Sequence, residues 1–245
     1  MDIKALITLV VSVGTSIITT EANESSTRVK RIIGGGRLPI SRVPYQELDI
    51  LIRAGSDRRN TGGIVRHMKW SIIHPHYSAN RVTNDVALIL LNTPLVVSSG
   101  ISCIKMAHQG HAPIIGQRGL VSGWGVTNPY LDVAVPSSYP ITLQYTSLPV
   151  IDFEWCNEMY PSYTLLRGAQ FCAGYVNGGT DTCTGDSGGP FVVDRILVGI
   201  ISWGVSCAEP YHPGVFSNVG TYRFWIDEVV RQYSRSGAMM CSHYF

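Results

Sequence analysis

The sequence predicts an all-β fold that ends in a helix, and three observations support this prediction. Residues 86–91 form a continuous apolar run with the length of a buried strand. Residues 141–150 alternate roughly between apolar and polar side chains, as a half-buried strand does. Residues 221–233 instead place apolar side chains on one helical face. The 245 residues, 45% of them hydrophobic, suffice for one large all-β domain or two small ones.

Residues 1–22 have the composition of a secretory signal peptide. Lys4 precedes an apolar run over residues 5–13, and small and polar residues follow up to Ala22. The run is too short to span a membrane. A buried N-terminal strand explains it less well, because the run lies at the extreme end of the chain. We therefore expect a secreted, extracellular protein, whose cysteines tend to pair in an oxidising compartment.

The charge balance indicates neither a nucleic-acid nor a membrane partner. The formal net charge is +2, the sequence pI is about 8.2, and no long block of Lys and Arg occurs. The histidines and cysteines do not have the spacing of metal ligands, so we expect no metal and no cofactor.

The most informative stretch is residues 181–190, which read DTCTGDSGGP. A serine hydroxyl such as that of Ser187 is a weak nucleophile until a neighbouring base activates it. Gly185 allows a backbone turn in which its N–H and that of Ser187 face one point, where they would hold an oxyanion. A hairpin turn is the commoner meaning of clustered Gly and Asp. The composition of all ten residues nevertheless favours an acyl-transfer site.

This stretch resembles the active-site serine segment of trypsin-like, chymotrypsin-family serine proteases. Other segments along the chain resemble further motifs of that family and lie in the expected order. They are Arg31–Gly35, Asn84–Leu88, Ser122–Gly125, Ser202–Gly204 and Pro213–Phe216. The resemblance implies a protease domain over residues 32–233 with two packed antiparallel β-barrels of the six-stranded type. Residues 32–119 would form a truncated first barrel, and residues 120–233 the second barrel and a C-terminal helix. Residues 234–245 would be an additional tail.

The resemblance also implies a role for each site residue. Ser187 would be the nucleophile, the amides of Gly185 and Ser187 the oxyanion hole, and Asp85 the group that orients a catalytic histidine. Asp181, at the base of the substrate pocket, would select Arg or Lys. The remaining pocket residues would be Thr182, Ser202, Trp203, Gly204 and Gly214. The implied partners are proteins or peptides with Arg or Lys, and protein inhibitors of the same pocket.

Residues 23–31 resemble an activation propeptide that ends at a basic cleavage site. In the family, an activating protease would cut after Arg31, and the new amine of Ile32 would pair with the carboxylate of Asp186. Such pairing is physically reasonable, because a buried carboxylate is costly unless a cation neutralises it. The pairing would order the loop that carries the oxyanion donors.

One family segment has no counterpart in this sequence. After Gln46 the chain runs within a few residues into residues 48–56, which resemble the strand that follows the catalytic histidine. The histidine motif and the two cysteines that bracket it are therefore missing together. Loss of a whole block differs from gradual decay of a site, and we interpret it as a skipped exon, an incomplete gene model or a splice form.

Other histidines do not obviously replace the missing one. The candidates around Asp85 are His67, His74, His76, His108 and His111. Residues 74–77 resemble a surface loop of the family, where histidine is usually incidental. A replacement base would have to reach Ser187 by a hydrogen bond, and the sequence does not indicate that reach. The pair Arg58–Arg59 is interpreted as solvated charge at a strand tip.

Six cysteines allow fifteen pairings, so spacing alone does not choose between them. The resemblance implies the disulfides Cys156–Cys172 and Cys183–Cys207. Cys103 and Cys241 would be free, paired with each other, or bonded to another chain.

The resulting expectation is a secreted serine endopeptidase that is made as a zymogen and cleaves after Arg or Lys. Because the catalytic histidine is missing, this chain is expected to have little or no activity. The alternatives are an inactive homologue that binds or regulates, and a defective splice product.

Overall fold

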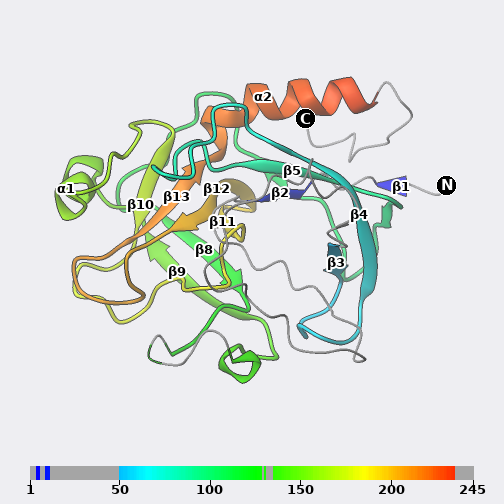
Figure 1. Cartoon of the computed structure of the whole chain (residues 1–245), viewed down its shortest axis with the longest axis horizontal. Helices are drawn as coiled ribbons and strands as arrows, with labels where there is room; N and C mark the ends of the chain where they lie inside the picture. Colours follow the sequence, from blue (N-terminus) through cyan, green and yellow to red (C-terminus); the bar gives the residue numbers. More distant parts are fainter. Residues whose placement is uncertain (1–3, 6–8, 12–49, 129, 131–134, 235–245) are drawn as a thin grey trace, which may run out of the picture.

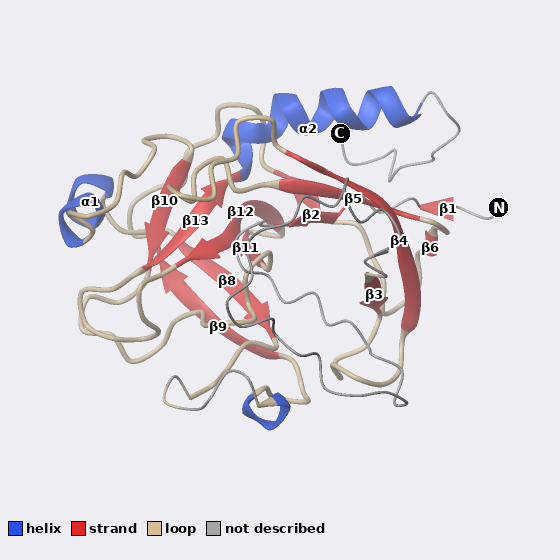
Figure 2. Ribbon diagram, in the orientation of Figure 1, coloured by secondary structure: helices blue, strands red, loops and turns tan. Residues whose placement is uncertain are grey.

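The computed structural model describes residues 4–5, 9–11, 50–128, 130 and 135–234. Two bodies of antiparallel β-sheet lie side by side, and a long C-terminal helix crosses one end of both (Figure 1). The helices lie outside the sheets (Figure 2). This arrangement confirms the predicted all-β class with its C-terminal helix.

The second body is a barrel of six antiparallel strands. The strands are β8 Arg118–Gly123, β9 Gln144–Pro149, β10 Gln170–Ala173, β11 Pro190–Val193, β12 Ile196–Trp203 and β13 Gly214–Asn218. Their order is β10-β13-β12-β11-β8-β9, and a bridge between Val150 and Ala173 joins the two outer strands. The short strand β7, Lys105–Met106, adds to β12 in parallel. The predicted strand over residues 141–150 corresponds to β9.

Three phenylalanine rings fill the centre of this barrel. Phe171, Phe191 and Phe216 lie with their ring centroids 5.0–5.3 Å apart, and all three are buried. Each aromatic pair at this separation contributes about 0.5–1.5 kcal/mol beyond the burial of its area. The barrel is therefore a rigid base for the loops that leave its rim.

The first body is a smaller, half-barrel sheet with the order β2-β5-β4-β3. Its strands are β2 Leu9–Val11, β3 Leu51–Ala54, β4 Ile64–Ile73 and β5 Ala87–Leu91, and a separate pair joins β1 Lys4–Ala5 to β6 Leu95–Val96. Every residue of β5 is buried, which confirms the strand predicted from the apolar run. Strands β1 and β2 fall in the segment expected to be a signal peptide, and its removal stays a prediction.

Three helical segments complete the described chain. They are η2 Pro136–Ser138, α1 Phe153–Met159 and α2 Val219–Ser234. Helix α1 begins where the side chain of Asp152 accepts a hydrogen bond of 3.0 Å from the amide of Trp155. Helix α2 packs Tyr222, Ile226 and Val229 against strands of both bodies. It is the predicted helix, longer by two residues at its start and one at its end.

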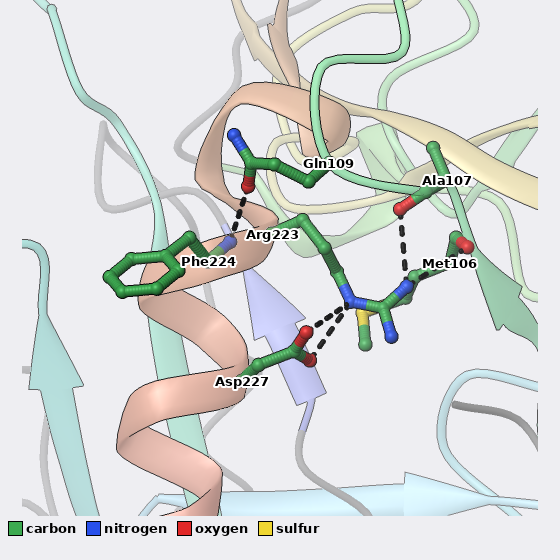
Figure 3. A network of polar contacts seen from close by, with 6 residues as sticks. All are labelled: Met106, Ala107, Gln109, Arg223, Phe224 and Asp227. Atoms are coloured by element: carbon green, nitrogen blue, oxygen red, sulfur yellow. Dashed lines mark hydrogen bonds and ion pairs between the residues drawn. The ribbon is translucent and has the colours of Figure 1, made fainter.

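Arg223 anchors α2 to the chain that links the two bodies (Figure 3). Its Nε donates to both oxygens of Asp227 at 2.9 and 3.0 Å, and its Nη1 donates to the carbonyls of Met106 and Ala107 at 3.2 Å each. Nearby, the amide of Phe224 donates to the side chain of Gln109 at 2.6 Å. The Arg223 side chain is nearly buried, so these partners replace its lost hydration.

We expect Arg223→Ala to lower the free energy of unfolding by about 2–3 kcal/mol, because it removes the hydrogen-bond donor of Asp227 and of two carbonyls. Urea denaturation followed by tryptophan fluorescence measures this change. The matched control is Arg231→Ala, which breaks an exposed pair with Glu228 on the same helix and should cost less than about 1 kcal/mol. Equal losses in the two variants would contradict the anchoring role of Arg223.

The two disulfides implied by the resemblance are present. Cys156 is bonded to Cys172, and Cys183 to Cys207. Cys103 is also in a disulfide, which excludes a free thiol from the three alternatives for this residue. The other remaining cysteine, Cys241, lies outside the described residues.

Candidate active site

The loop over residues 181–189 leads into β11 and is shaped by two tight turns. The amide of Asp186 donates to the carbonyl of Cys183 at 3.0 Å, and the amide of Gly189 donates to the carbonyl of Asp186 at 2.8 Å. Gly185 and Gly188 have φ values of +98° and +84°, in the left-handed region that favours glycine. Ser187 stands between these glycines, on a turn whose first part is tied to Cys207 by the disulfide.

This loop forms one wall of a pocket of about 160 Å³. The pocket contains all eight residues that the sequence assigned to substrate binding and the oxyanion hole, which are Asp181, Thr182, Gly185, Ser187, Ser202, Trp203, Gly204 and Gly214. They come from the serine loop, the end of β12 and the start of β13. The fold therefore brings together segments that are up to 33 residues apart in sequence.

Two glycines keep the pocket open. A Cβ atom on Gly214 would lie 3.1 Å from Oδ1 of Asp181 and 3.3 Å from Oγ1 of Thr182. A Cβ atom on Gly204 would lie 3.3 Å from the carbonyl of Ser206. Any side chain at Gly214 would therefore crowd the carboxylate of Asp181.

The carboxylate of Asp181 lies half-buried in the pocket. Burial raises the pKa of Asp181 to about 7, and a hydrogen bond of 2.7 Å from the amide of Thr182 offsets part of that rise. The nearby carboxylate of Asp186 raises it further. A ligand cation beside Asp181 would relieve the cost of keeping this carboxylate ionised.

Asp186 lies on the far side of the serine loop in a backbone cradle. Its Oδ1 accepts a hydrogen bond of 2.8 Å from the amide of Gly125, and its Oδ2 one of 3.0 Å from the amide of Cys183. Cβ atoms on Gly123 and Gly125 would come within 2.0 and 2.4 Å of its carboxyl group, so only glycine fits at both positions. Burial raises the pKa of Asp186, and the two amides oppose that rise.

Asp186 and Asp181 both line a second cavity, of about 220 Å³. Arg31 and Ile32, which the sequence connected with Asp186, lie outside the described residues.

Asp85 is fully buried, two residues before the start of β5 at Ala87. The hydroxyl of Ser202 donates to Oδ2 of Asp85 at 2.6 Å, and the hydroxyl of Ser217 donates to its carbonyl at 2.8 Å. These bonds join Asp85 of the first body to β12 and β13 of the second. Sequence reasoning placed Ser202 in the pocket but missed its bond to Asp85, because 117 residues separate the two.

Among the described residues, the pocket lining includes no histidine. Residues 74–77 form a loop in which His76 is exposed, as expected, but His74 is half-buried, with its ring 5.3 Å from Tyr222 and 4.9 Å from Trp225 of α2. Burial and the neighbouring His76 lower the pKa of His74. The rings of His108 and His111 pack on each other with centroids 5.1 Å apart.

Sequence reasoning also missed Tyr139 and Arg59. Tyr139 packs against Gly185, and the guanidinium of Arg59 lies over the Tyr139 ring, with 5.6 Å between its central carbon and the ring centroid. Arg58 is exposed, as expected, but the interpretation of Arg59 as solvated charge is wrong, since it is half-buried.

In the described part of the chain, no group of three or more His, Cys, Asp or Glu side chains is placed to hold a metal ion. The described helices include none with the length and apolar character that a membrane span requires.

Residues 43–226 match the family model described as Trypsin. Trypsin eta of Drosophila erecta is 37% identical over 179 residues, which cover 73% of this chain and 67% of that protein. Trypsin-3 of Salmo salar is 38% identical over 159 residues, or 65% of this chain and 63% of the relative. Serine protease 1 of Canis lupus familiaris is 35% identical over 185 residues, or 75% and 69%. The alignments thus span about two thirds of each relative's length.

Proposed function

Because the chain belongs to the trypsin family of serine proteases, we propose that it recognises Arg or Lys side chains of proteins or peptides in the Asp181 pocket and presents their peptide bond to Ser187. The observation that carries this proposal is that Asp181 and Ser187 border one pocket of about 160 Å³. A single carboxylate in a half-buried site favours a cationic side chain, because an ion pair with that cation compensates for the hydration that the carboxylate has lost.

Each residue then has a chemical role. Ser187 Oγ attacks the peptide carbonyl, and the amides of Gly185 and Ser187 hold the oxygen that becomes negative. Asp85, already bonded to Ser202, occupies the position that would orient a histidine base, but no histidine lines the described pocket, so the serine proton must pass to water. Without that base, removal of the serine proton is unassisted, and kcat is expected to fall by about 10⁶-fold.

The proposal includes zymogen activation and secretion. Cleavage after Arg31 frees the amine of Ile32, which enters the cavity beside Asp186 and pairs with its carboxylate. The cavity volume of about 220 Å³ and the backbone cradle around Asp186 support this step. The signal peptide over residues 1–22 and the propeptide over residues 23–31 direct export and set the cleavage site for an activating protease.

The second candidate function is a non-catalytic homologue that binds or regulates. It is favoured by the lining of the described pocket, which offers Asp181 for a cation but includes no histidine as a base. The same protein surface would then bind Arg- or Lys-containing partners or protein inhibitors without cutting them. A defective splice product would do neither.

Two probes distinguish these candidates on the full chain. An amidine-bearing phenyl phosphonate diester labels Ser187 only when the serine is activated, because Oγ must displace phenoxide from phosphorus. p-Aminobenzamidine binds the Asp181 pocket and needs no base. Labelling together with binding indicates a protease, binding alone indicates the non-catalytic homologue, and the absence of both overturns the proposed pocket.

We expect Asp186→Asn to prevent activation of the pocket by cleavage. In the native chain, cleavage after Arg31 should raise the affinity for p-aminobenzamidine at least about tenfold, because the new ammonium pairs with Asp186. A neutral amide cannot hold that ammonium, so the variant should show no gain after cleavage. The control is Asp57→Asn at an exposed position. An equal gain in the variant and in native protein would contradict the pairing.

A further inference from the structure

We propose that Arg59 is a positioning residue for the oxyanion loop, which it stabilises by holding the ring of Tyr139 against Gly185. This inference rests on the proposed function, because that function places Gly185 in the oxyanion hole. Arg59 itself does not border the pocket that contains Ser187. It acts through one intervening aromatic ring.

Two contacts connect Arg59 to the oxyanion loop, and the first of them lies between Tyr139 and Gly185. A Cβ atom on Gly185 would lie 2.8 Å from Cε1 of Tyr139 and 3.2 Å from Cα of Gly125. This ring and the Gly125 backbone therefore both lie close to the side of Gly185, with φ of +98°, that a side chain would occupy. A glycine has more backbone freedom than any other residue, so these neighbours limit the orientations that its amide can adopt.

The second contact lies between Arg59 and Tyr139. The guanidinium lies over the ring, 5.6 Å from its centroid, in the geometry of a cation–π interaction. Its Nη2 donates to the carbonyl of Pro136 at 3.3 Å, at the start of the turn that precedes Tyr139. The Nε of Arg59 is buried and has no hydrogen-bond partner among the described residues. A buried donor without a partner costs free energy, so the contacts that this side chain makes with Tyr139 and Pro136 must offset that cost. We therefore assign Arg59 a packing role.

The backbone holds Arg59 in register with the Tyr139 segment. The amide of Arg59 donates to the carbonyl of Ile141 at 2.8 Å, and the amide of Leu143 donates to the carbonyl of Asp57 at 2.7 Å. A bridge pairs Arg58 with Thr142 between these two bonds. A loop of the first body is thus paired with the chain of the second body just beyond Tyr139. Arg58 takes part in the same backbone pairing but has an exposed side chain, so Arg58→Ala is a matched control for Arg59→Ala.

An oxyanion hole depends on donors that are fixed before the reaction starts, because donors that must first reorient stabilise the transition state less. Tyr139 restricts one of the two proposed donors, and Arg59 restricts Tyr139. Loss of the Arg59 guanidinium should therefore loosen residues 184–188 while leaving the barrel intact.

Hydrogen exchange of the full chain tests the inference without any need for catalysis. Arg59→Ala should speed exchange in residues 184–188 about fivefold, the factor that corresponds to the loss of one cation–π contact worth about 1 kcal/mol. Arg58→Ala should leave these residues unchanged, and Arg59→Lys should restore part of the protection. Tyr139→Ala should speed exchange as Arg59→Ala does, and the double variant should add little to either.

Three results would overturn the role of Arg59: native exchange rates in Arg59→Ala, equal effects of Arg58→Ala and Arg59→Ala, or a uniform increase over the whole chain. Ligand binding separates this failure from failure of the proposed function. If native protein binds an amidine-bearing arylboronate, which forms a tetrahedral adduct with serine, Arg59→Ala should weaken that binding about fivefold while p-aminobenzamidine binding stays within about twofold. If native protein forms no such adduct, the missing base accounts for that result as well as a wrong assignment of Gly185 would, and exchange alone decides whether Arg59 holds this loop.

Discussion

Replacing Asp181 by serine is expected to weaken p-aminobenzamidine binding by at least about 100-fold, since an unpaired cation in a half-buried site costs several kcal/mol. Thr182, the polar neighbour of Asp181 in the pocket, offers a hydroxyl but no negative charge. Gly204 and Gly214 have no side chain that could pair with the ligand cation in place of Asp181. Among the residues that line this pocket, Asp181 therefore supplies the only carboxylate that attracts an amidinium.

Fluorescence titration of the full chain at pH 8 measures the effect. Asp57→Ser, which removes an exposed carboxylate of the first body, is the matched control and should bind as native protein does. Misfolding would not explain the loss, because burial raises the pKa of Asp181 and its ionised form therefore disfavours the folded state at this pH. Asp181→Ser should be at least as stable to urea as native protein. Affinity that survives in this variant would rule out Asp181 as the selecting residue.

The local part of the site could be predicted from the sequence, because its chemistry is carried by ten consecutive residues. The stretch over residues 181–190 contains the nucleophile candidate, its carboxylates and the glycines whose positive φ values shape the turn. The pocket glycines and the two disulfides followed from a resemblance, and the structure contains them where the resemblance implied. Strand β5 was recognisable because a fully buried strand has no polar alternation.

Contacts between distant segments could not be predicted in this way. Ser202 is bonded to Asp85 across 117 residues, and Arg59 donates to Pro136 across 77. Arg59 has an ordinary surface composition around it, and the pairing of residues 57–59 with residues 141–143 brings it beside Tyr139 and Pro136. His74 likewise becomes half-buried because α2, about 150 residues later, packs over it. In each case tertiary pairing decides the environment of the side chain, and local pattern carries no information about it.

The pH dependence of ligand binding gives the second large effect. We expect the affinity of native protein for p-aminobenzamidine to rise about tenfold per pH unit up to pH 7 and to level off above it, a change of about 100-fold between pH 5 and pH 8. The amidinium stays charged over this range, whereas Asp181, with a pKa of about 7, is mostly protonated at pH 5. Binding below pH 7 therefore requires the loss of one proton from Asp181, and that requirement weakens it.

Two neighbouring groups need controls, because both lie close enough to Asp181 to affect it. Burial also raises the pKa of Asp186, so Asp186 could in principle be the titrating group. If Asp181 is that group, the affinity of Asp186→Asn for p-aminobenzamidine should still rise with pH below pH 7, even though its affinity at each pH is lower. Tyr160 has a strongly raised pKa and stays neutral throughout the range. Asp181→Ser should give a flat profile. If native protein also gave a flat profile, or if the slope disappeared in Asp186→Asn instead, the titrating group would not be Asp181, and the cation in the pocket would be paired elsewhere.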